Sequence, residues 1–290
     1  MPIQFHRPRF RRDFSSESSF DGTAKPPWLM LAAANGVTSG IEIVNLDNAV
    51  GLVVKSRNEN IAEFSEPQGS TNNDSRELMI TGKSPGVTFI DVFAPGSNTA
   101  VLTKLEVSVK NQIVHTIAFH LVTDSLVIKS TRSSTSLTIL HNVLNDIFWK
   151  RANVRFNLTR SDSIEASTNL MNIVIEQERH SSHAPRREWD KLVVGGDPDA
   201  EINVFFMPWE ARVAKRPTEM LVYDGDIVCA DSMSDDDLRV AFPHVIGSFL
   251  GCPVDYNDRH KDYLMYESHA EGTDGGSFMP KDSINMINPD

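Results

Sequence analysis

The chain has 290 residues, of which 40% are hydrophobic and 23% are charged, and its formal net charge is −11. This composition is typical of a globular protein of about two domains and excludes a fibrous or wholly disordered chain. The acidic balance argues against nucleic acid or an anionic lipid surface as a partner, because binding to either requires basic patches. No window contains 18 consecutive apolar residues, so we expect no membrane-spanning segment.

Residues 1–25 predict a disordered basic arm. Arg7, Arg9, Arg11 and Arg12 precede a serine-rich run, and the segment has no apolar periodicity. It also lacks the apolar core of a secretory signal peptide. We therefore expect a chain that is cytoplasmic or is exported without an ordinary signal peptide, and the residues leave that choice open.

Residues 26–111 predict an all-β sandwich, because short alternating apolar runs are separated by clusters of Asn, Gly and Pro. The runs are residues 41–45, 52–55, 78–81, 87–93 and 102–109. The stretch 80–92, together with residues 60–65 before it, resembles the bacterial immunoglobulin-like domains of the group 2 type. In that family the domain is a spacer or adhesive module, so the resemblance implies an architecture and no site residues.

Residues 112–290 predict a second domain, of the α+β class. A strand at 113–122 is followed by a helix at 134–151, in which apolar residues recur on one face. Those residues are Leu137, Leu140, Leu144, Ile147 and Phe148. Further strands are predicted at 153–158, 171–175 and 202–207, which together with the helix indicate a sheet that carries helices.

The most informative segment is residues 237–256, followed by residues 263–266 and 278–289. These segments resemble the active-site helix, Met-turn and terminal helix of zincin metalloproteases, in particular the metzincins. The resemblance implies a zincin-like domain over nearly all of residues 112–290. In the family, two histidines four residues apart on one helix bind Zn²⁺, and a glutamate beside the first takes a proton from the metal-bound water.

Compared with the family motif, the chain lacks most of the chemical groups. His244 matches the first ligand, but Val245 stands at the position of the general base and Ser248 at that of the second ligand. Valine cannot accept a proton, and serine is a poor zinc ligand. Gly251 matches the turn glycine and Met265 the Met-turn. The resemblance therefore implies a degenerate site with no catalytic residue.

A rearranged metal site is the alternative interpretation of the same segment. Asp255 follows the position of the family's third ligand, and His260 comes five residues later. His244, Asp255 and His260 would offer two imidazoles and one carboxylate, a set that suits Zn²⁺. We expect no bound cofactor, and zinc is the ion that these residues would accommodate.

The residues before this segment predict the start of a helix. Ser234 is suited to the N-cap, and Asp235, Asp236 and Asp237 would lie in the first turn, where carboxylates complement the helix dipole. These acids also raise the alternative of a Ca²⁺ site, but they lack the loop spacing of an EF-hand. Cys229 and Cys252, the two cysteines, are too few for a disulfide scaffold and leave a single disulfide open.

The leading hypothesis from the sequence is a catalytically inactive zincin-like pseudoprotease that acts as a protein-binding or structural module. Such a module could hold a protein segment by strand addition along an exposed edge. One alternative is an active metalloprotease or hydrolase with a rearranged metal site, including an exported bacterial effector. Another is a purely structural component. We expect a protein partner and no nucleic acid, and the sequence leaves the oligomeric state open.

Overall fold

The computed structural model describes residues 3–7, 18–33, 37–44, 51–67, 74–166, 195–208, 220–223, 226–230, 234–257, 263–266 and 278–289. The chain forms two compact units. One consists of Met1–Ile113, Phe148–Val154 and Met279–Asp290, and the other of Val114–Ile147 and Arg155–Phe278. Each unit is therefore assembled from segments that are distant in the sequence.

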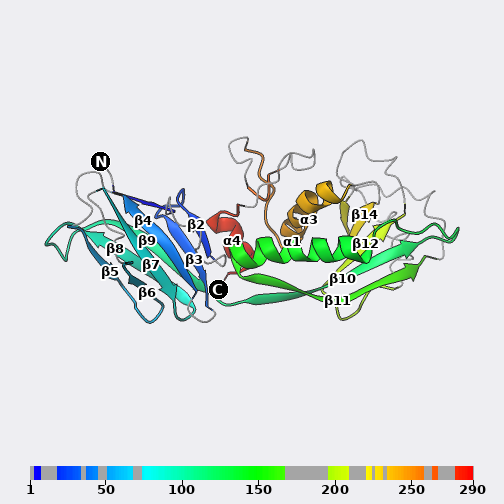
Figure 1. Cartoon of the computed structure of the whole chain (residues 1–290), viewed down its shortest axis with the longest axis horizontal. Coiled ribbons are helices and arrows are strands. Elements are labelled where there is room, and N and C mark those ends of the chain that lie inside the picture. The colour runs from blue at the N-terminus through cyan, green and yellow to red at the C-terminus, as the bar shows by residue number, and fades with distance from the viewer. Residues whose placement is uncertain are drawn as a thin grey trace. The chain divides into compact units, whose positions relative to one another are not determined.

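Two sheets make up the N-terminal unit (Figure 1). The four-stranded sheet has the order β1 (Gln4–His6), β4 (Thr38–Val44), β7 (Ser75–Gly82), β6 (Ala62–Ser65). The five-stranded sheet has the order β2 (Ser18–Asp21), β3 (Trp28–Ala32), β9 (Val101–Lys110), β8 (Gly86–Phe93), β5 (Val53–Ser56). Neighbouring strands are antiparallel, apart from β3 and β9, which are parallel.

The core of this unit contains residues from both sheets. In β7 the buried residues alternate with half-buried ones, which points Leu78 and Ile80 to one face of the strand. These two residues belong to one apolar cluster with Leu29 and Leu31 of β3 and Val107 of β9. Burial of apolar surface, at about 25 cal/mol per Å², is the main term that stabilises such a core.

Two strands lie within the first 25 residues, for which the sequence predicts a disordered arm. That prediction is wrong for the described part of the segment, because β1 pairs with β4 and β2 pairs with β3. Phe5 of β1 is buried. Strands of three and four residues are too short to show a period of two, so pairing within the folded unit decides their structure. Of the four arginines in the predicted arm, Arg9, Arg11 and Arg12 lie outside the described residues.

The C-terminal helix α4 (Lys281–Ile287) belongs to the same unit as these strands. Its N-cap residue is Pro280, which makes no side-chain cap. A side chain from β2 supplies the missing acceptor instead, because Asp21 Oδ2 accepts the Lys281 N–H at 3.1 Å. The Lys281 ammonium donates to Glu106 Oε1 of β9 at 2.7 Å. Residues 260 positions apart in the chain are thus joined.

Two asparagines satisfy backbone carbonyls where strand β9 and the first helix end. Asn288 Nδ2 donates to the carbonyl oxygens of Asn111, at 2.9 Å, and of Ala152, at 2.7 Å. Asn153 Nδ2 donates to the Lys110 carbonyl at 2.9 Å. Asn153 has a φ of 53°, a left-handed conformation that asparagine tolerates better than most residues.

The carboxyl of Asp21 makes the stability of this unit depend on pH. Desolvation raises the pKa of Asp21, but hydrogen bonds outweigh it, and the pKa lies below its ordinary value. The donors are the hydroxyl of Thr23 and the N–H groups of Lys281, Thr23 and Ala24. A lowered pKa means that the ionised carboxyl stabilises the folded state above the unfolded pKa, about 3.9, and that this is lost as the pH falls through the folded value.

We predict that Asp21→Asn lowers the free energy of unfolding by about 1 kcal/mol at pH 7, because an amide nitrogen replaces one acceptor. The difference from the wild type should shrink when the pH falls below about 3.9, where the wild-type carboxyl also becomes neutral. Urea unfolding of both proteins at pH 7 and at a pH below about 3.9 measures this difference in the free energy of unfolding. Glu59→Gln, at an exposed position of the same unit, is the control and should have no such effect. An equal loss at both pH values would contradict the prediction.

The other unit is built on a five-stranded sheet in the order β11, β10, β12, β14, β13 (Figure 1). The strands are β10 (Ile113–Thr123), β11 (Val154–Glu165), β12 (Ile202–Met207), β13 (Met220–Tyr223) and β14 (Asp226–Ala230). β12 is parallel to β10 and β14, and β13 is antiparallel to β14. The N–H of Ile113 donates to Asn153 O and that of Ala166 to Thr123 O, so β10 and β11 also run in the same direction.

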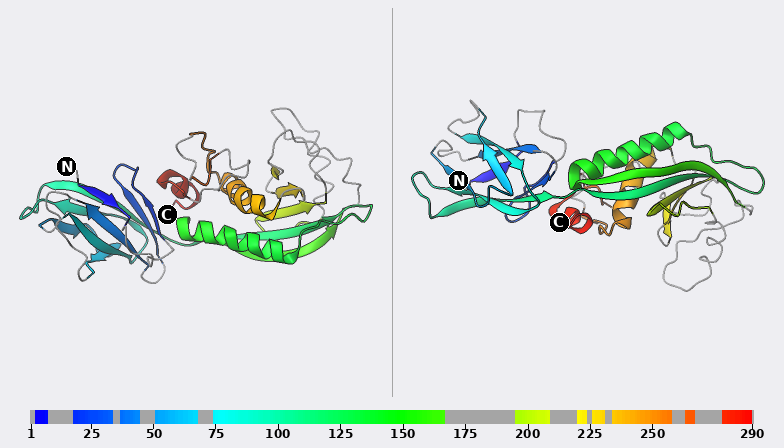
Figure 2. Two further views of the ribbon diagram at one scale, coloured as in Figure 1. Left: turned by 45° about the horizontal axis from the view of Figure 1, so that its top comes forward. Right: turned by 90° about the horizontal axis from the view of Figure 1, so that it is seen from below.

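Helix α1 (Ser134–Ala152) runs along β10 and β11 (Figure 2). Its N-terminus is capped by Ser133, whose Oγ accepts the Ser136 N–H at 3.1 Å. Leu137, Leu140 and Leu144 are buried at the predicted spacing. The sequence prediction of this helix is therefore confirmed. An apolar stripe on one face of a helix is stable when another element covers it, and here the sheet does so.

The predicted C-terminal α+β zincin-like domain is wrong as a fold class. Of the described residues, 46% are in strands and 21% in helices, and three helices are described. Strand content exceeds the prediction partly because β11 continues through exposed polar residues to Glu165, where no apolar alternation signals a strand. The predicted terminal helix, α4, packs in the N-terminal unit. A zincin-like framework is not shown, and the strand predicted at 171–175 lies outside the described residues.

Candidate functional site

Helix α3 (Asp235–Phe249) carries the residues that the sequence singles out. Ser234 is its N-cap, and its Oγ accepts the Asp237 N–H at 3.1 Å. Asp235, Asp236 and Asp237 lie in the first turn, where the helix dipole favours negative charge. The predicted helix start is therefore confirmed.

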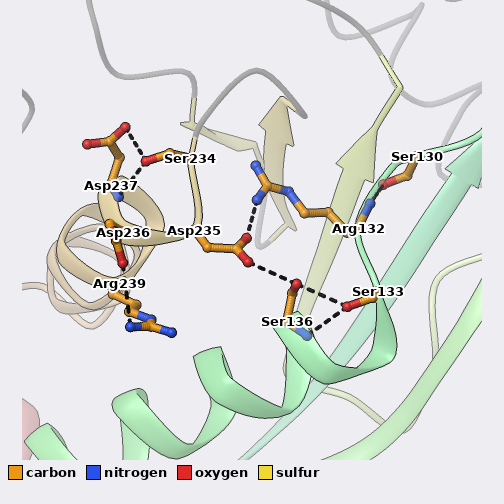
Figure 3. A network of polar contacts seen from close by, with 9 residues as sticks. All are labelled: Ser130, Arg132, Ser133, Ser136, Ser234, Asp235, Asp236, Asp237 and Arg239. Atoms are coloured by element: carbon orange, nitrogen blue, oxygen red, sulfur yellow. Dashed lines mark hydrogen bonds and ion pairs between the residues drawn. The ribbon is translucent and has the colours of Figure 1, made fainter.

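The first turn of α3 also binds the start of α1 (Figure 3). Asp235 Oδ1 pairs with the guanidinium of Arg132, and Asp235 Oδ2 accepts the hydroxyl of Ser136 at 3.1 Å. The Arg132 side chain is 7% exposed, whereas that of Asp235 is 50% exposed. Asp236 instead faces Arg239 across one turn, and its side chain is 91% exposed. One acid of the run therefore fixes the helix against the rest of the unit, and its neighbour does not.

We predict that Asp235→Asn lowers the free energy of unfolding by about 1 kcal/mol, because the charge-assisted bond to Arg132 is lost. Asp236→Asn is the matched control and should change it by less than about 0.5 kcal/mol. Each variant removes one charge from the same helical turn, so the effect on the helix dipole is comparable and the difference isolates the Arg132 contact. Urea unfolding at low and high salt measures both. Equal losses in the two variants would contradict the assignment.

The middle of α3 packs on the sheet through its apolar face. Leu238, Phe242 and Ile246 are buried, and the ring of Phe242 meets that of Phe119 in β10 edge-on, with centroids 6.0 Å apart. Pro243 lies inside the helix, which continues past it to Phe249. The helix does not begin late at this proline. The proline has no N–H, so the turn lacks one ordinary helical hydrogen bond.

His244 connects α3 to the segment that contains Met265. His244 Nδ1 donates to the Leu264 carbonyl at 3.0 Å. Met265 is buried, and its carbonyl accepts the Asp255 N–H at 2.7 Å. The Leu264 N–H donates in turn to the Phe278 carbonyl at 2.8 Å. The structure thus brings the backbone of Asp255, the turn at Met265 and the ring of His244 into one connected arrangement.

The other predicted positions on α3 serve its packing and its end. Val245 is half-buried and Ser248 is exposed. Gly251 has a φ of 93°, a conformation that disfavours a side chain, and follows directly on the last helical turn. Its N–H donates to the Ser248 carbonyl at 3.0 Å, and the Cys252 N–H to the Gly247 carbonyl at 2.9 Å. These bonds satisfy helix carbonyls that would otherwise lack partners.

A metal site was the alternative for this region. Asp255 Oδ1 accepts the Asn257 N–H at 2.9 Å, and His260 lies outside the described residues. Within the part of the chain that the structure describes, no set of three His, Cys, Asp or Glu side chains converges as metal ligands would. The zinc set of His244, Asp255 and His260 therefore stays a prediction. Cys229 and Cys252 are both buried and are not joined by a disulfide.

The chemistry open to His244 follows from its hydrogen bond. A neutral ring that donates from Nδ1 carries its lone pair on Nε2. Proton transfer through a metal-bound water would need a carboxylate beside it, and the next residue, Val245, has no such group. The arrangement can hold the helix against the Met265 turn. It supplies no group that could act as general base at position 245.

A buried histidine network, which sequence reasoning missed, lies in β10. His120 is fully buried, with Nδ1 2.7 Å from Asp162 Oδ1 of β11 and Nε2 2.9 Å from Asn203 Oδ1 of β12. The Asp197 N–H donates to the same amide oxygen at 2.8 Å. Both ring nitrogens thus lie within hydrogen-bond distance of side-chain oxygens on the two neighbouring strands. Its only sequence signal is a histidine inside an apolar strand.

Asp197 adds a second link between this network and β11. The Thr159 hydroxyl donates to Asp197 Oδ2 at 2.7 Å, and the Asp199 N–H donates to Oδ1 at 3.0 Å. These bonds hold the pKa of Asp197 below its ordinary value, with smaller contributions from the charges of Arg160 and His120. The network therefore joins β10, β11, β12 and the segment before β12.

Comparison with known proteins gives no family. No family model matches the chain, and no curated protein matches it. Similar solved structures include the S-layer protein SbsC, at 18% identity with a TM-score of 0.22, over 27% of this chain and 11% of that one. Two others are SbsC domains 4 and 5 and SbsC domains 4–9, each at 18% identity with a TM-score of 0.23. They cover 32% of this chain and 50% and 13% of those chains.

TM-scores this low carry no inference about fold or function. The chain spans at most half the length of the S-layer structures that it matches. None of the described helices has the length and apolar character needed to cross a membrane.

Proposed function

We propose that this chain is a non-catalytic module that acts by binding another protein. The observation that carries the proposal is the use made of α3. His244 donates to the Leu264 carbonyl and so ties the helix to the Met265 turn, while Val245 beside it has no acidic or basic group. A histidine engaged in this way, without a general base at the next position, supports a structural role for the helix.

Binding, as opposed to an inert structural role, is supported by the edge strand β11. It forms one edge of the five-stranded sheet and has 12 residues, most of them exposed. The edge of a sheet presents unpaired N–H and C=O groups, which an extended segment of another protein can pair with. The overall charge of −11 supports a protein partner over nucleic acid.

We predict that the full chain does not hydrolyse unfolded polypeptides, with or without added Zn²⁺, and that His244→Ala changes no hydrolysis rate. The substrates are casein and a fluorogenic peptide library, followed over hours. His115→Ala, at another histidine of the same unit, controls for contaminating protease. Zinc-dependent hydrolysis that persists in His115→Ala and is lost in His244→Ala would overturn the proposal and favour the rearranged metal site.

A further inference from the structure

The edge of β11 differs from every other described sheet edge in this protein. The three sheets end in β1, β6, β2, β5, β13 and β11. The first five have three or four residues each, whereas β11 has 12. Proteins commonly protect an edge by making its strand short or by placing proline or lysine on it. β11 is long and contains neither proline nor lysine, and its charged residues are Arg155, Arg160, Asp162 and Glu165.

The start of β11 is already paired by side chains of α1. The Phe156 N–H donates to Asn145 Oδ1 at 2.8 Å, and the Phe156 carbonyl accepts Asn145 Nδ2 at 3.0 Å. His141 Nε2 lies 2.8 Å from the same carbonyl. Such side-chain caps take the place of a neighbouring strand at Phe156. The segment from Leu158 to Ile164 continues as an edge strand beyond them.

The sequence of this segment is complementary to itself when read in reverse. With Ser161 at the centre, Arg160 falls opposite Asp162, and Leu158 opposite Ile164. Thr159 falls opposite Ser163 in the same way. An antiparallel pair of two identical strands would thus set opposite charges and two apolar side chains against each other, and both kinds of cross-strand pair are stabilising.

No neighbouring register has this property. An axis on Arg160 would place arginine opposite arginine and Leu158 opposite Asp162. An axis on Asp162 would place aspartate opposite aspartate. Like charges directly opposite each other are destabilising.

The charged pair is formed within one chain and is accessible. Arg160 Nε lies 2.6 Å from Asp162 Oδ2, and the Arg160 side chain is 51% exposed. Asp162 Oδ1 is held by His120, which fixes the carboxylate at the edge. Leu158 is 38% exposed. In the dimer, Arg160 of each chain could pair with Asp162 of the other chain in place of its own, so both Asp162 carboxylates would keep an arginine partner. The pairing would also cover Leu158.

We propose that the partner of this edge is a second copy of the same chain, paired antiparallel along residues 158–164 with its two-fold axis at Ser161. The proposal rests on the proposed binding function and names its partner. The β11-β10-β12-β14-β13 sheets of the two copies would join into one continuous sheet across the axis. A two-fold axis requires this kind of self-complementary patch, in which residue i contacts residue j and residue j contacts residue i.

The dimer should be weak and should form at high concentration. Seven paired residues on each chain make a contact at the small end of protein interfaces, below about 1,200 Å². Sedimentation velocity over about 1 to 500 µM covers the affinity expected for such a contact. A dimer whose fraction rises over this range is the expected result, and a monomer at every concentration would overturn the proposal.

Charge reversal tests whether the predicted pairs hold the dimer. Arg160→Glu should weaken dimerisation by about tenfold or more, because both symmetric pairs become repulsive. Asp162→Lys should do the same, whereas Arg239→Glu on α3 should leave dimerisation unchanged. An equimolar mixture of Arg160→Glu and Asp162→Lys chains should form a heterodimer, since opposite charges again face each other. Dimerisation insensitive to Arg160→Glu, or no heterodimer from two folded variants, would overturn the proposal.

Cysteine cross-linking tests the register itself. Opposite residues of an antiparallel pair have Cα atoms about 4.5–5.5 Å apart, within the range for a disulfide. Ser161→Cys should therefore cross-link to its own copy on mild oxidation. In Ser163→Cys, the matched control, the two sulfurs would belong to residues about 13 Å apart along the strands and should not cross-link. The native Cys229 and Cys252 are buried. Equal cross-linking of both variants would reject the register.

The outcomes separate this inference from the proposed function. A chain that stays monomeric and hydrolyses no polypeptide rejects the second copy as partner, and it leaves the binding function to be tested with other proteins. A chain that dimerises through Ser161 and also hydrolyses polypeptides in a zinc-dependent manner rejects the non-catalytic function alone.

Discussion

The unit that contains α1 and α3 depends on one interaction above all, the pairing of strand β10 with a neighbouring strand on each of its two sides. β10 bonds to β11 along one edge and to β12 along the other, and the side chain of His120 reaches acceptors on both neighbours. A buried histidine is costly unless its ring nitrogens have partners. Here Asp162 and Asn203 provide them, so the fully buried ring of His120 has a partner at each nitrogen and links the three strands.

The same strand positions α1 and α3, the two helices described in this unit. Phe119, the residue before His120, meets Phe242 of α3, and α1 runs along β10 and β11. Asp235 then joins the start of α3 to Arg132 before α1. With its apolar face on the sheet and its first turn held by an ion pair, α3 has a fixed position. His244 completes this attachment through the Leu264 carbonyl, and this contact is the basis of the structural role that we propose for the helix.

Side-chain contacts within this unit hold the edge strand β11 in an extended conformation. Asp162 is held on the β10 side by His120, and Thr159 bonds to Asp197, so the strand is fixed in place as far as its exposed end. A fixed strand can pair with a new strand at little cost in conformational entropy, because its backbone is already extended. This physical property connects the buried network of the sheet to the proposed pairing of two copies about Ser161.

The sequence by itself determined the elements whose signals are local. The leucine spacing of α1, Ser234 before three aspartates, and the alternation in β7 each depend on residues within a few positions of one another, and the structure confirms them. The sequence alone also shows that position 245 is a valine, which cannot accept a proton, and position 248 a serine.

Only the tertiary structure decided the features that depend on residues far apart in the chain. These include the pairing of β1 and β2, the docking of α4 on Asp21, the polar end of β11, and the network around His120. The predicted α+β domain failed for the same reason. Polar strand residues show no period in the sequence, since their structure is set by the neighbouring strand to which their backbone bonds, and that neighbour is chosen by the whole fold.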